Sequence, residues 1–338
     1  MALRLWPRPP LMPHPTTDNS GLIQVMQAVG GGIAGAATRT ITQPLDVLKI
    51  RFQMQVEPLT NRKGSKYRGI LHAFRSVYAE EGMRGMFRGH NSGQVLSISY
   101  ALVQFWSYEQ LRSMAHQSVF WNERPFLMFF VCGGLAGCLG ACAAQPFDVV
   151  RTQMVAADPS SRRSQMSTWS GLRRVYRTEG WDGFTRGMSF TLVQIFPLVG
   201  ANFFFYKYLN ALVLAAKPPD LRQEIHGAFL FINGALSGVA AKMLVYPADL
   251  LKKRIQLMAF KQERKTFGRN PDCPTLLGCI TTTFRVEGIG GFYKGMSPTL
   301  LKAGLTSAVY FTIYDLFKRH YIAPLREPDK GRQKRGKT

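Results

Sequence analysis

Six long, weakly polar stretches alternate with strongly charged connections along the chain. They cover residues 22–50, 91–111, 125–150, 189–214, 228–251 and 297–317. Each approaches or exceeds the ~20 residues that an α-helix needs to cross a bilayer, so the pattern predicts six transmembrane helices. The mean hydropathy of −0.07 hides them because the connections are so polar. Six buried helices of a large soluble protein are the alternative that the pattern alone leaves open.

Basic side chains interrupt three of these stretches: Arg39 the first, Lys242 the fifth and Lys302 the sixth. A charge inside a membrane span is costly unless it faces a polar interior. We therefore expect the helices to surround a polar cavity that contains these three groups. No carboxylate is assigned to the same place, so the cavity is expected to bind a multiply anionic ligand such as a di- or polyphosphate.

One motif occurs three times at nearly constant spacing. It reads Gln-Pro-Leu-Asp-Val-Leu-Lys from residue 43, Gln-Pro-Phe-Asp-Val-Val-Arg from residue 145 and Tyr-Pro-Ala-Asp-Leu-Leu-Lys from residue 246. Its prolines, Pro44, Pro146 and Pro247, lie 102 and 101 residues apart. A second element follows each copy, from Glu-Gly at residues 81, 179 and 287 to a basic residue and glycine at 88, 186 and 294. Such self-similarity predicts three repeats of about a hundred residues.

The repeats divide the chain into five segments. A Pro-rich lead that we expect to be disordered covers residues 1–21, the repeats cover 22–120, 121–222 and 223–322, and a basic tail covers 323–338. No cleavable signal is evident at the start. Before each proline lies a glycine pair four residues apart (Gly31 and Gly35, Gly133 and Gly137, Gly234 and Gly238), which is typical of closely packed membrane helices.

The three prolines are expected to bend their helices and to bring the following turns together. In each turn an aspartate stands three residues before a lysine or arginine, on nearly the same helix face. A local surface ion pair is the simple interpretation of one copy. Three converging copies instead predict a ring of inter-repeat pairs that closes the cavity: Asp46 with Arg151, Asp148 with Lys252, and Asp249 with Lys49.

The second element predicts short helices along the membrane surface. Their free N-terminal amides can bind phosphate, as in an anionic lipid, with Tyr67-Arg68-Gly69 and Trp169-Ser170-Gly171 as the corners before two of them. Simple glycine capping is an equally good explanation.

Charge and chemistry-bearing residues exclude other classes. The connections 51–88, 151–186 and 252–294 carry +15 of the net charge of +23, which places them together on the matrix-equivalent side of a membrane. No nucleic-acid-binding module is present. The six histidines are dispersed, and no nucleophile, base or metal constellation indicates an enzyme. The five cysteines form no metal-binding pattern and are expected to pack: Cys132, Cys138, Cys142, Cys273 and Cys279.

The paired motifs resemble the signature of the mitochondrial carrier family over residues 22–320. This resemblance implies an all-α membrane protein whose six transmembrane helices form a threefold pseudosymmetric barrel with short matrix-surface helices. It further implies a monomer in the inner mitochondrial membrane, with both termini toward the intermembrane space, bound cardiolipin, and solute exchange by alternating access without a cofactor or metal.

The family pattern also implies an outer gate near the ends of the second, fourth and sixth predicted transmembrane helices. It assigns Glu109, Arg112, Asp315 and Lys318 to this gate. Repeat 2 departs from the pattern at Lys207 and Asn210, so we expect Lys318 to pair with Glu109, Arg112 to meet Lys207, and Asn210 to hydrogen-bond Asp315. This gate is therefore expected to be weak, and the state open to the matrix sparsely populated.

The expected substrate follows from positions where the repeats differ. Arg39 and Lys242 stand seven residues before a gate aspartate, whereas repeat 2 has Ala141 there. The family's contact positions fall on Leu96, on Gln194 with Ile195, and on Lys302. Further segments, including Ile195-Phe196-Pro197, resemble the branch of the family that carries thiamine pyrophosphate, with Phe196, Phe203 and Tyr100 as possible contacts of its rings. A nucleotide or coenzyme A carrier, or a scaffold or leak protein on this fold, remains the alternative.

Overall fold

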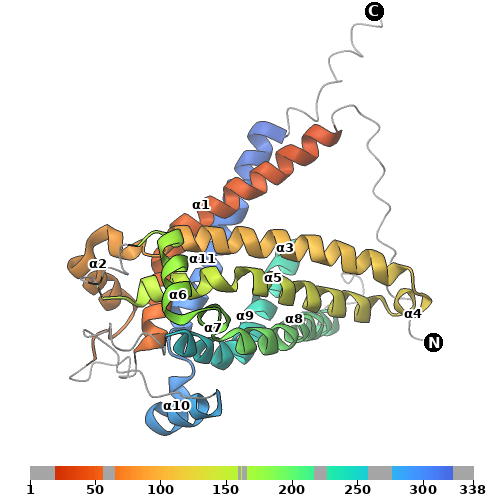
Figure 1. Ribbon diagram of the computed structural model, residues 1–338. Coiled ribbons are helices and arrows are strands. Elements are labelled where there is room, and N and C mark those ends of the chain that lie inside the picture. Colours follow the sequence, from red (N-terminus) through yellow and green to blue (C-terminus); the bar gives the residue numbers. More distant parts are fainter. Residues whose placement is uncertain are drawn as a thin grey trace, which may run out of the picture. The chain divides into compact units, whose positions relative to one another are not determined.

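The computed structural model describes residues 20–55, 65–158, 161, 166–216, 227–257 and 276–322, and this part of the chain is helical without strands (Figure 1). The chain divides into two units, residues 40–305 on the one hand and residues 1–39 with 306–338 on the other. Nearly all of the predicted lead, the whole basic tail and Cys273 lie outside the described residues.

Long helices occupy each of the six predicted stretches. They are α1 (Ser20–Met54), α3 (His90–His116), α5 (Pro125–Ala156), α8 (Met188–Ala216), α9 (Gly227–Gln256) and α11 (Met296–Phe317). Even the shortest, with 22 residues, extends about 33 Å, the thickness of a bilayer core. Within the described residues, Leu127–Ala156 and Asp182–Leu212 are apolar enough to span a membrane by composition alone. The other long helices carry more polar side chains.

Short helices stand between the long ones, as the second element predicts. They are α2 (Ile70–Met86), α6 (Thr168–Glu179) and α10 (Leu276–Gly291), with single turns at α4 (Val119–Asn122), α7 (Asp182–Thr185) and the π-helical Lys318–Ile322. The prediction that Trp169-Ser170-Gly171 precede α6 is wrong, because the helix already begins at Thr168, next to an extended Ser167. Gly69 does precede α2.

The glycine of each Glu-Gly element makes a sharp change of direction possible. Gly82, Gly180 and Gly288 have φ values of 64°, 64° and 65°. Their ψ values are −162°, −153° and −165°, a combination that is essentially restricted to glycine. This conformation turns the chain toward the next long helix. We call α2, α6 and α10, the short helices that contain or precede these glycines, the surface helices.

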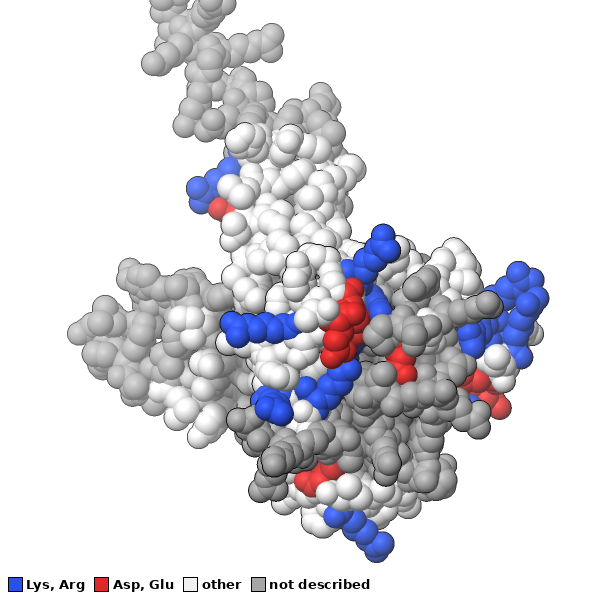
Figure 2. Space-filling model, turned by 90° about the vertical axis from the view of Figure 1, so that its left-hand side faces the viewer, with Lys and Arg blue, Asp and Glu red and all other residues white. Residues whose placement is uncertain are grey.

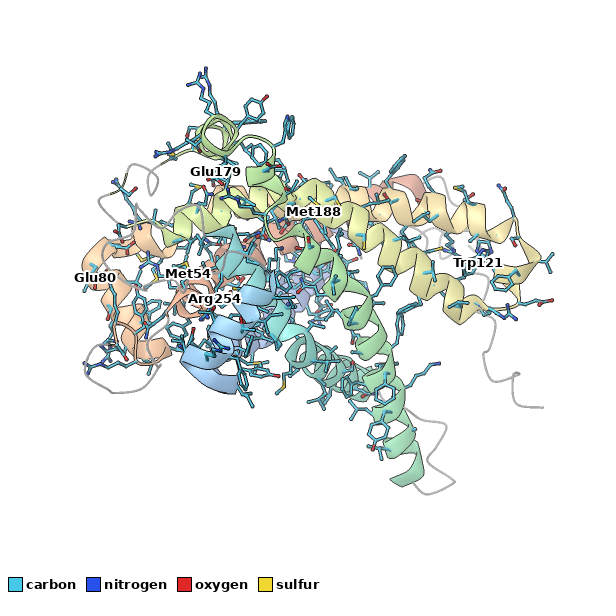
Figure 3. The ribbon with its side chains drawn as sticks, turned by 60° about the horizontal axis from the view of Figure 1, so that its bottom comes forward. Met54, Glu80, Trp121, Glu179, Met188 and Arg254 are labelled. Atoms are coloured by element: carbon cyan, nitrogen blue, oxygen red, sulfur yellow. The ribbon has the colours of Figure 1, made fainter. Side chains whose placement is uncertain are left out.

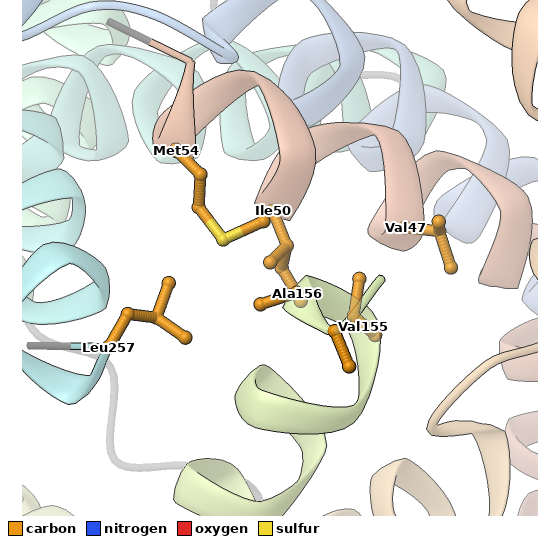
Figure 4. Packing of buried hydrophobic residues seen from close by; sticks show 7 residues of the cluster. Val47, Ile50, Met54, Val155, Ala156 and Leu257 are labelled. Atoms are coloured by element: carbon orange, nitrogen blue, oxygen red, sulfur yellow. The ribbon is translucent and has the colours of Figure 1, made fainter. Parts of the chain in front are cut away.

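The first long helices of the three repeats, α1, α5 and α9, converge at their C-terminal ends. Pro44, Pro146 and Pro247 lie inside α1, α5 and α9 as predicted. Beyond them, Val47 and Ile50 of α1 pack with Val155 of α5 and with Leu257, which follows α9, in one buried cluster (Figure 4). Burying apolar side chains from three segments so far apart in sequence holds these ends together.

The predicted glycine pairs are not the closest helix contacts. Within the described residues, a Cβ added at Gly35, Gly133, Gly234 or Gly238 has no heavy atom within 4 Å. At Gly140, by contrast, it would lie 3.0 Å from the Tyr100 carbonyl, where α3 runs beside α5 (Figure 1). Two of the predicted glycines do face a neighbouring helix, since an added Cβ would lie 3.3 Å from the Ile195 side chain at Gly137 and 3.5 Å from the Tyr310 hydroxyl at Gly31. The four-residue spacing therefore predicted only part of the close contacts. In the unit of the chain ends, Gly30 of α1 faces the ring of Phe317.

Candidate functional site

Three buried ion pairs connect the three repeats in a closed cycle. Each aspartate of the Pro-x-Asp motif pairs with the basic residue of another repeat, at the level of the helix ends just described. The nitrogen–oxygen distances are 2.7 Å for Asp46–Arg151, 2.8 Å for Asp148–Lys252 and 2.6 Å for Asp249–Lys49. The predicted pairing is confirmed for all three. It closes the space between α1, α5 and α9 at this end.

A second cation approaches each of the three aspartates. Lys302 Nζ lies 2.6 Å from Asp46 Oδ1, and Lys253 Nζ lies 2.7 Å from Asp148 Oδ1. Lys242 Nζ lies 3.7 Å from Asp249 Oδ2. We call these three aspartates and their six cations the charged cluster. It holds three more positive than negative charges.

The expectation that Lys242 and Lys302 have no carboxylate partner is therefore wrong. Lys242 stands two helical turns before Asp249 on the same face of α9, and its long side chain reaches along the helix. Lys302 reaches Asp46 from another repeat. Their side chains nevertheless keep about 30% of their surface exposed, 30% for Lys242 and 29% for Lys302, so both can still meet a solute.

The other predicted binding residues lie in different surroundings. Leu96 lines a small hollow beside Ala141. Ile195 is buried against Gly137, where an added Cβ would lie 3.3 Å from its side chain. Gln194 Oε1 is buried and accepts no hydrogen bond from the described residues. Arg39 belongs to the unit of the chain ends, and its place in the cavity stays a prediction.

The glutamate of the second element links each surface helix to the long helix before it. Arg51 binds Glu81 through two hydrogen bonds of 2.6 and 2.9 Å, and Arg254 binds Glu287 in the same bidentate way (Figure 3). In repeat 2, Gln153 makes a single 3.4 Å contact with Glu179. We did not predict these links. The signal was present, since each of the three residues stands two positions after a gate cation.

The same glutamates bind the basic residue that ends the second element. Arg88 lies 2.8 Å from Glu81, Arg186 lies 2.7 Å from Glu179, and Lys294 pairs with Glu287. Burial lowers the pKa of the Arg88 guanidinium below its usual value, an effect that the neighbouring Glu81 opposes. On the side of the molecule where α2 lies, Figure 2 shows exposed Lys and Arg side chains beside exposed Asp and Glu side chains.

Each repeat also joins its two elements by a hydrogen bond from the residue before the proline. Gln43 donates to the Arg88 carbonyl at 2.9 Å, and Gln145 donates to the Arg186 carbonyl at 2.8 Å. In repeat 3 the Tyr246 hydroxyl donates to the Lys294 carbonyl at 3.0 Å. In each repeat, this bond therefore links the start of the second long helix (α3, α8 or α11) to the end of the first (α1, α5 or α9).

Glycine at the end of the second element lets one repeat approach the next. A Cβ at Gly89 would lie 3.3 Å from the carbonyl of Arg151, and one at Gly187 would lie 3.1 Å from that of Lys252. Gly295 faces the carbonyl of Lys49 at 3.0 Å. These three carbonyls belong to the cations of the three ion pairs, Arg151, Lys252 and Lys49. The backbone beside each pair therefore packs against a glycine of the neighbouring segment.

The predicted outer-gate residues make contacts of several kinds. Arg112 donates to His116 at 3.3 Å and lies over the ring of Phe129. Asp315 pairs with Arg319 at 2.8 Å on an exposed surface. Asn210 accepts a hydrogen bond from Asn233, so Asn210 and Asp315 each have a partner that we did not predict. The pairing of Lys318 with Glu109 stays a prediction, as does that of Arg112 with Lys207.

Within the part of the chain that the structure describes, no group of three His, Cys, Asp or Glu side chains is suited to a metal ion. The charged cluster combines cations with carboxylates and contains no nucleophile with an adjacent base.

Comparison with known proteins defines the class to which this cluster belongs. Residues 24–119, 122–217 and 226–324 each match the family described as Mitochondrial carrier protein. The chain therefore belongs to the mitochondrial carrier family, as the repeated motifs predicted, and it is a transport protein rather than an enzyme.

Particular members of the family are similar over most of their length. The bovine mitochondrial thiamine pyrophosphate carrier is 39% identical over 305 residues, which cover 90% of this chain and 95% of the bovine protein. The human protein of the same name is 38% identical over 310 residues, with coverage of 90% and 94%. The mitochondrial thiamine diphosphate carrier 1 of Arabidopsis thaliana is 30% identical over 326 residues, with coverage of 89% and 95%.

Proposed function

We propose that this protein exchanges thiamine pyrophosphate across the inner mitochondrial membrane by alternating access. The observation that carries the proposal is the surplus of three positive charges in the charged cluster. The names of the bovine, human and plant relatives support the choice of substrate. A diphosphate is compact and multiply negative, and it therefore complements a compact group of cations.

Substrate binding to the charged cluster can weaken the contacts that keep the gate closed. Lys302 and Lys242 bind Asp46 and Asp249, respectively. An arriving diphosphate competes with these carboxylates for the two lysines. Two charges at 4 Å interact with about 4 kcal/mol at an effective dielectric constant of 20, so taking Lys302 from Asp46 removes an appreciable attraction between repeats 3 and 1. Lys242 and Asp249 belong to the same helix, so releasing their contact provides a cation for the substrate without separating two repeats. Substrate binding then favours opening of the ring.

We further propose the arrangement around this gate. The six long helices form one barrel, both termini face the intermembrane space, and the ring closes the matrix side. The outer gate is weak because repeat 2 has Lys207 and Asn210 where the family pattern has an acidic and a basic residue. Replacing Lys207 by Asp together with Asn210 by Lys should shift the protein toward the matrix-open state.

Cardiolipin is the proposed lipid partner of the surface helices. The chain enters α2 through Gly69, which leaves backbone amides at the helix N-terminus available to a phosphate. Exposed aromatic side chains on the surface helices, such as Tyr78, Trp169 and Tyr176, suit the membrane interface. We propose that the carrier works as a monomer.

Reconstitution into liposomes tests the function. Vesicles loaded with unlabelled thiamine pyrophosphate should take up labelled thiamine pyrophosphate, whereas thiamine monophosphate, nucleoside di- and triphosphates and coenzyme A should exchange poorly. Lys302→Gln and Lys242→Gln should each reduce uptake at least tenfold, because each removes one cation that binds the diphosphate. Lys66→Gln, which breaks an exposed surface pair with Glu80, is the matched control and should transport normally.

Different outcomes point to different alternatives. Exchange of nucleotides or coenzyme A without thiamine pyrophosphate would indicate another carrier of the same family. Undiminished activity of both lysine variants would contradict the role of the cluster in substrate binding. A folded protein that exchanges none of these solutes would favour the scaffold or leak protein.

A further inference from the structure

A small hollow lies beside the charged cluster, where α3 of repeat 1 meets α5 of repeat 2. Its volume is about 140 Å³, and its apolar lining consists of Leu96 and Tyr100 from α3 with Ala141 and Ala144 from α5. Asp148 and Lys252, one of the gate pairs, also line it. The hollow and the charged cluster therefore share a boundary.

The space exists because repeat 2 departs from the other repeats. At the position of Ala141, repeats 1 and 3 carry the long basic side chains of Arg39 and Lys242. A side chain of that size at position 141 would occupy the hollow. The neutral, small residue thus leaves an uncharged recess next to a strongly positive site.

The volume of the hollow favours a ligand group the size of one aromatic ring. An apolar cavity of about 150 Å³ in a protein holds one benzene molecule, so a volume of about 140 Å³ suits a single aromatic ring. The fused double ring of a purine is larger. A ligand that places one ring here and its diphosphate on the neighbouring cations uses both halves of the site.

We propose that this hollow is a ring subsite, which binds the aminopyrimidine ring of the transported diphosphate. The inference rests on the proposed function and specifies how the substrate is oriented. Two polar groups line the hollow besides the ion pair, Gln145 and Thr191. Gln145 donates its amide N–H to the Arg186 carbonyl at 2.8 Å, which leaves its own carbonyl oxygen as an acceptor for the ring amino group.

The same surroundings disfavour the second ring of the substrate. The thiazolium ring carries a positive charge. Asp148 balances Lys252 in the lining of the hollow, but the charged cluster next to it holds a surplus of three positive charges. Like charges at this distance repel strongly in a poorly solvated site. The uncharged aminopyrimidine therefore occupies the recess, and the thiazolium ring remains in the wider cavity.

Filling the hollow tests the proposal. Ala141→Leu should raise the half-saturating concentration of thiamine pyrophosphate about 10- to 100-fold, as expected for the loss of one buried ring. Inhibition by inorganic pyrophosphate, which has the anionic head without a ring, should stay unchanged. Ala143→Leu makes the same substitution one residue away from the hollow's apolar wall, at a half-buried position outside the lining, and should leave both values unchanged.

A second variant and an analogue guard against a folding defect. Leu96→Phe fills the hollow from α3 and should reproduce the pattern of Ala141→Leu. Oxythiamine pyrophosphate, in which an oxygen replaces the ring amino group, should compete more weakly than thiamine pyrophosphate with the wild type, and the difference should shrink in either variant. The ring subsite would be overturned if the two variants lost equal affinity for thiamine pyrophosphate and for inorganic pyrophosphate, or if they lost affinity for neither. Failure of the wild type to exchange thiamine pyrophosphate would instead overturn the proposed function.

Discussion

Repeat 2 differs from repeats 1 and 3 at the surface helix, at the gate and in the cavity. Repeats 1 and 3 anchor their surface helices through buried arginine–glutamate pairs, whereas repeat 2 uses one glutamine contact. At the gate, the second cation of Asp148 is Lys253, which directly follows Lys252 in the sequence. The second cations of Asp46 and Asp249 are Lys302 and Lys242, the two lysines predicted to line the cavity. The comparison teaches that all three repeats contribute to the cycle of ion pairs, whereas the two partly exposed cations that a substrate can reach, Lys242 and Lys302, both come from repeat 3.

The largest expected effect concerns the anchors. Glu287→Gln leaves Arg254 and Lys294 without their carboxylate in a site where both Arg254 and Glu287 have 2% of their side-chain surface exposed. Removing one partner of a buried pair costs about 3–5 kcal/mol. Glu179→Gln should cost only ~1 kcal/mol, because its partner Arg186 is 31% exposed.

Thermal unfolding in detergent with a thiol-reactive dye measures this difference. The buried thiols of Cys132 and Cys279 become reactive as the helices separate, whereas the exposed Cys142 reacts at once and sets the baseline. If the two variants lost equal stability, the anchors of repeats 2 and 3 would be equivalent and the comparison would fail at this point.

The second prediction separates two kinds of gate lysine. Lys253→Met removes donors from Asp148, Thr152 and Gln256, at 2.7, 2.9 and 3.1 Å, and should cost about 1–3 kcal/mol of stability. Lys242→Met loses a 3.7 Å contact of a half-buried side chain and should cost under ~1 kcal/mol.

Transport should respond in the opposite order. At a temperature where both variants are folded, the Lys242 variant should lose uptake, and the Lys253 variant should keep most of it. Dye unfolding and liposome uptake on the same preparations provide the two measurements. The reverse order would assign substrate binding to Lys253 rather than to Lys242.

The smallest effect is expected from making repeat 2 resemble the others. Gln153→Arg places a guanidinium near Glu179, where Arg51 and Arg254 stand in their own repeats. A charge-assisted bond in place of the 3.4 Å contact should add about 1 kcal/mol of stability. Gln153→Lys is the matched control, since lysine supplies the charge without the planar fork. Equal gains would show that charge alone matters.

Local patterns predicted much of this molecule. Helical stretches follow from hydropathy and length, and the ring follows from motif spacing because Asp and Lys or Arg three residues apart share a helix face. Asp46–Arg151 was predictable once three copies were assumed to converge.

Contacts without a counterpart in the other repeats were not predictable in this way. Lys302 and Asp46 are 256 positions apart, and no repeated motif relates them. The glycine spacing could not specify which position on a helix face comes closest to a neighbour, and Gly140, two turns beyond Gly133 on the same face, meets a backbone carbonyl. The size of the hollow depends on how α3 packs against α5, which only the three-dimensional arrangement determines.

The cyclic order of the three gate pairs has a consequence for how the passage opens. Repeat 1 pairs with repeat 2, repeat 2 with repeat 3, and repeat 3 with repeat 1, so each repeat takes part in two pairs. Within each repeat, the hydrogen bond from Gln43, Gln145 or Tyr246 ties the neighbouring helix to the same body. Displacing any one body therefore strains two contacts at once. We expect opening to be cooperative, with few molecules in which a single pair is broken.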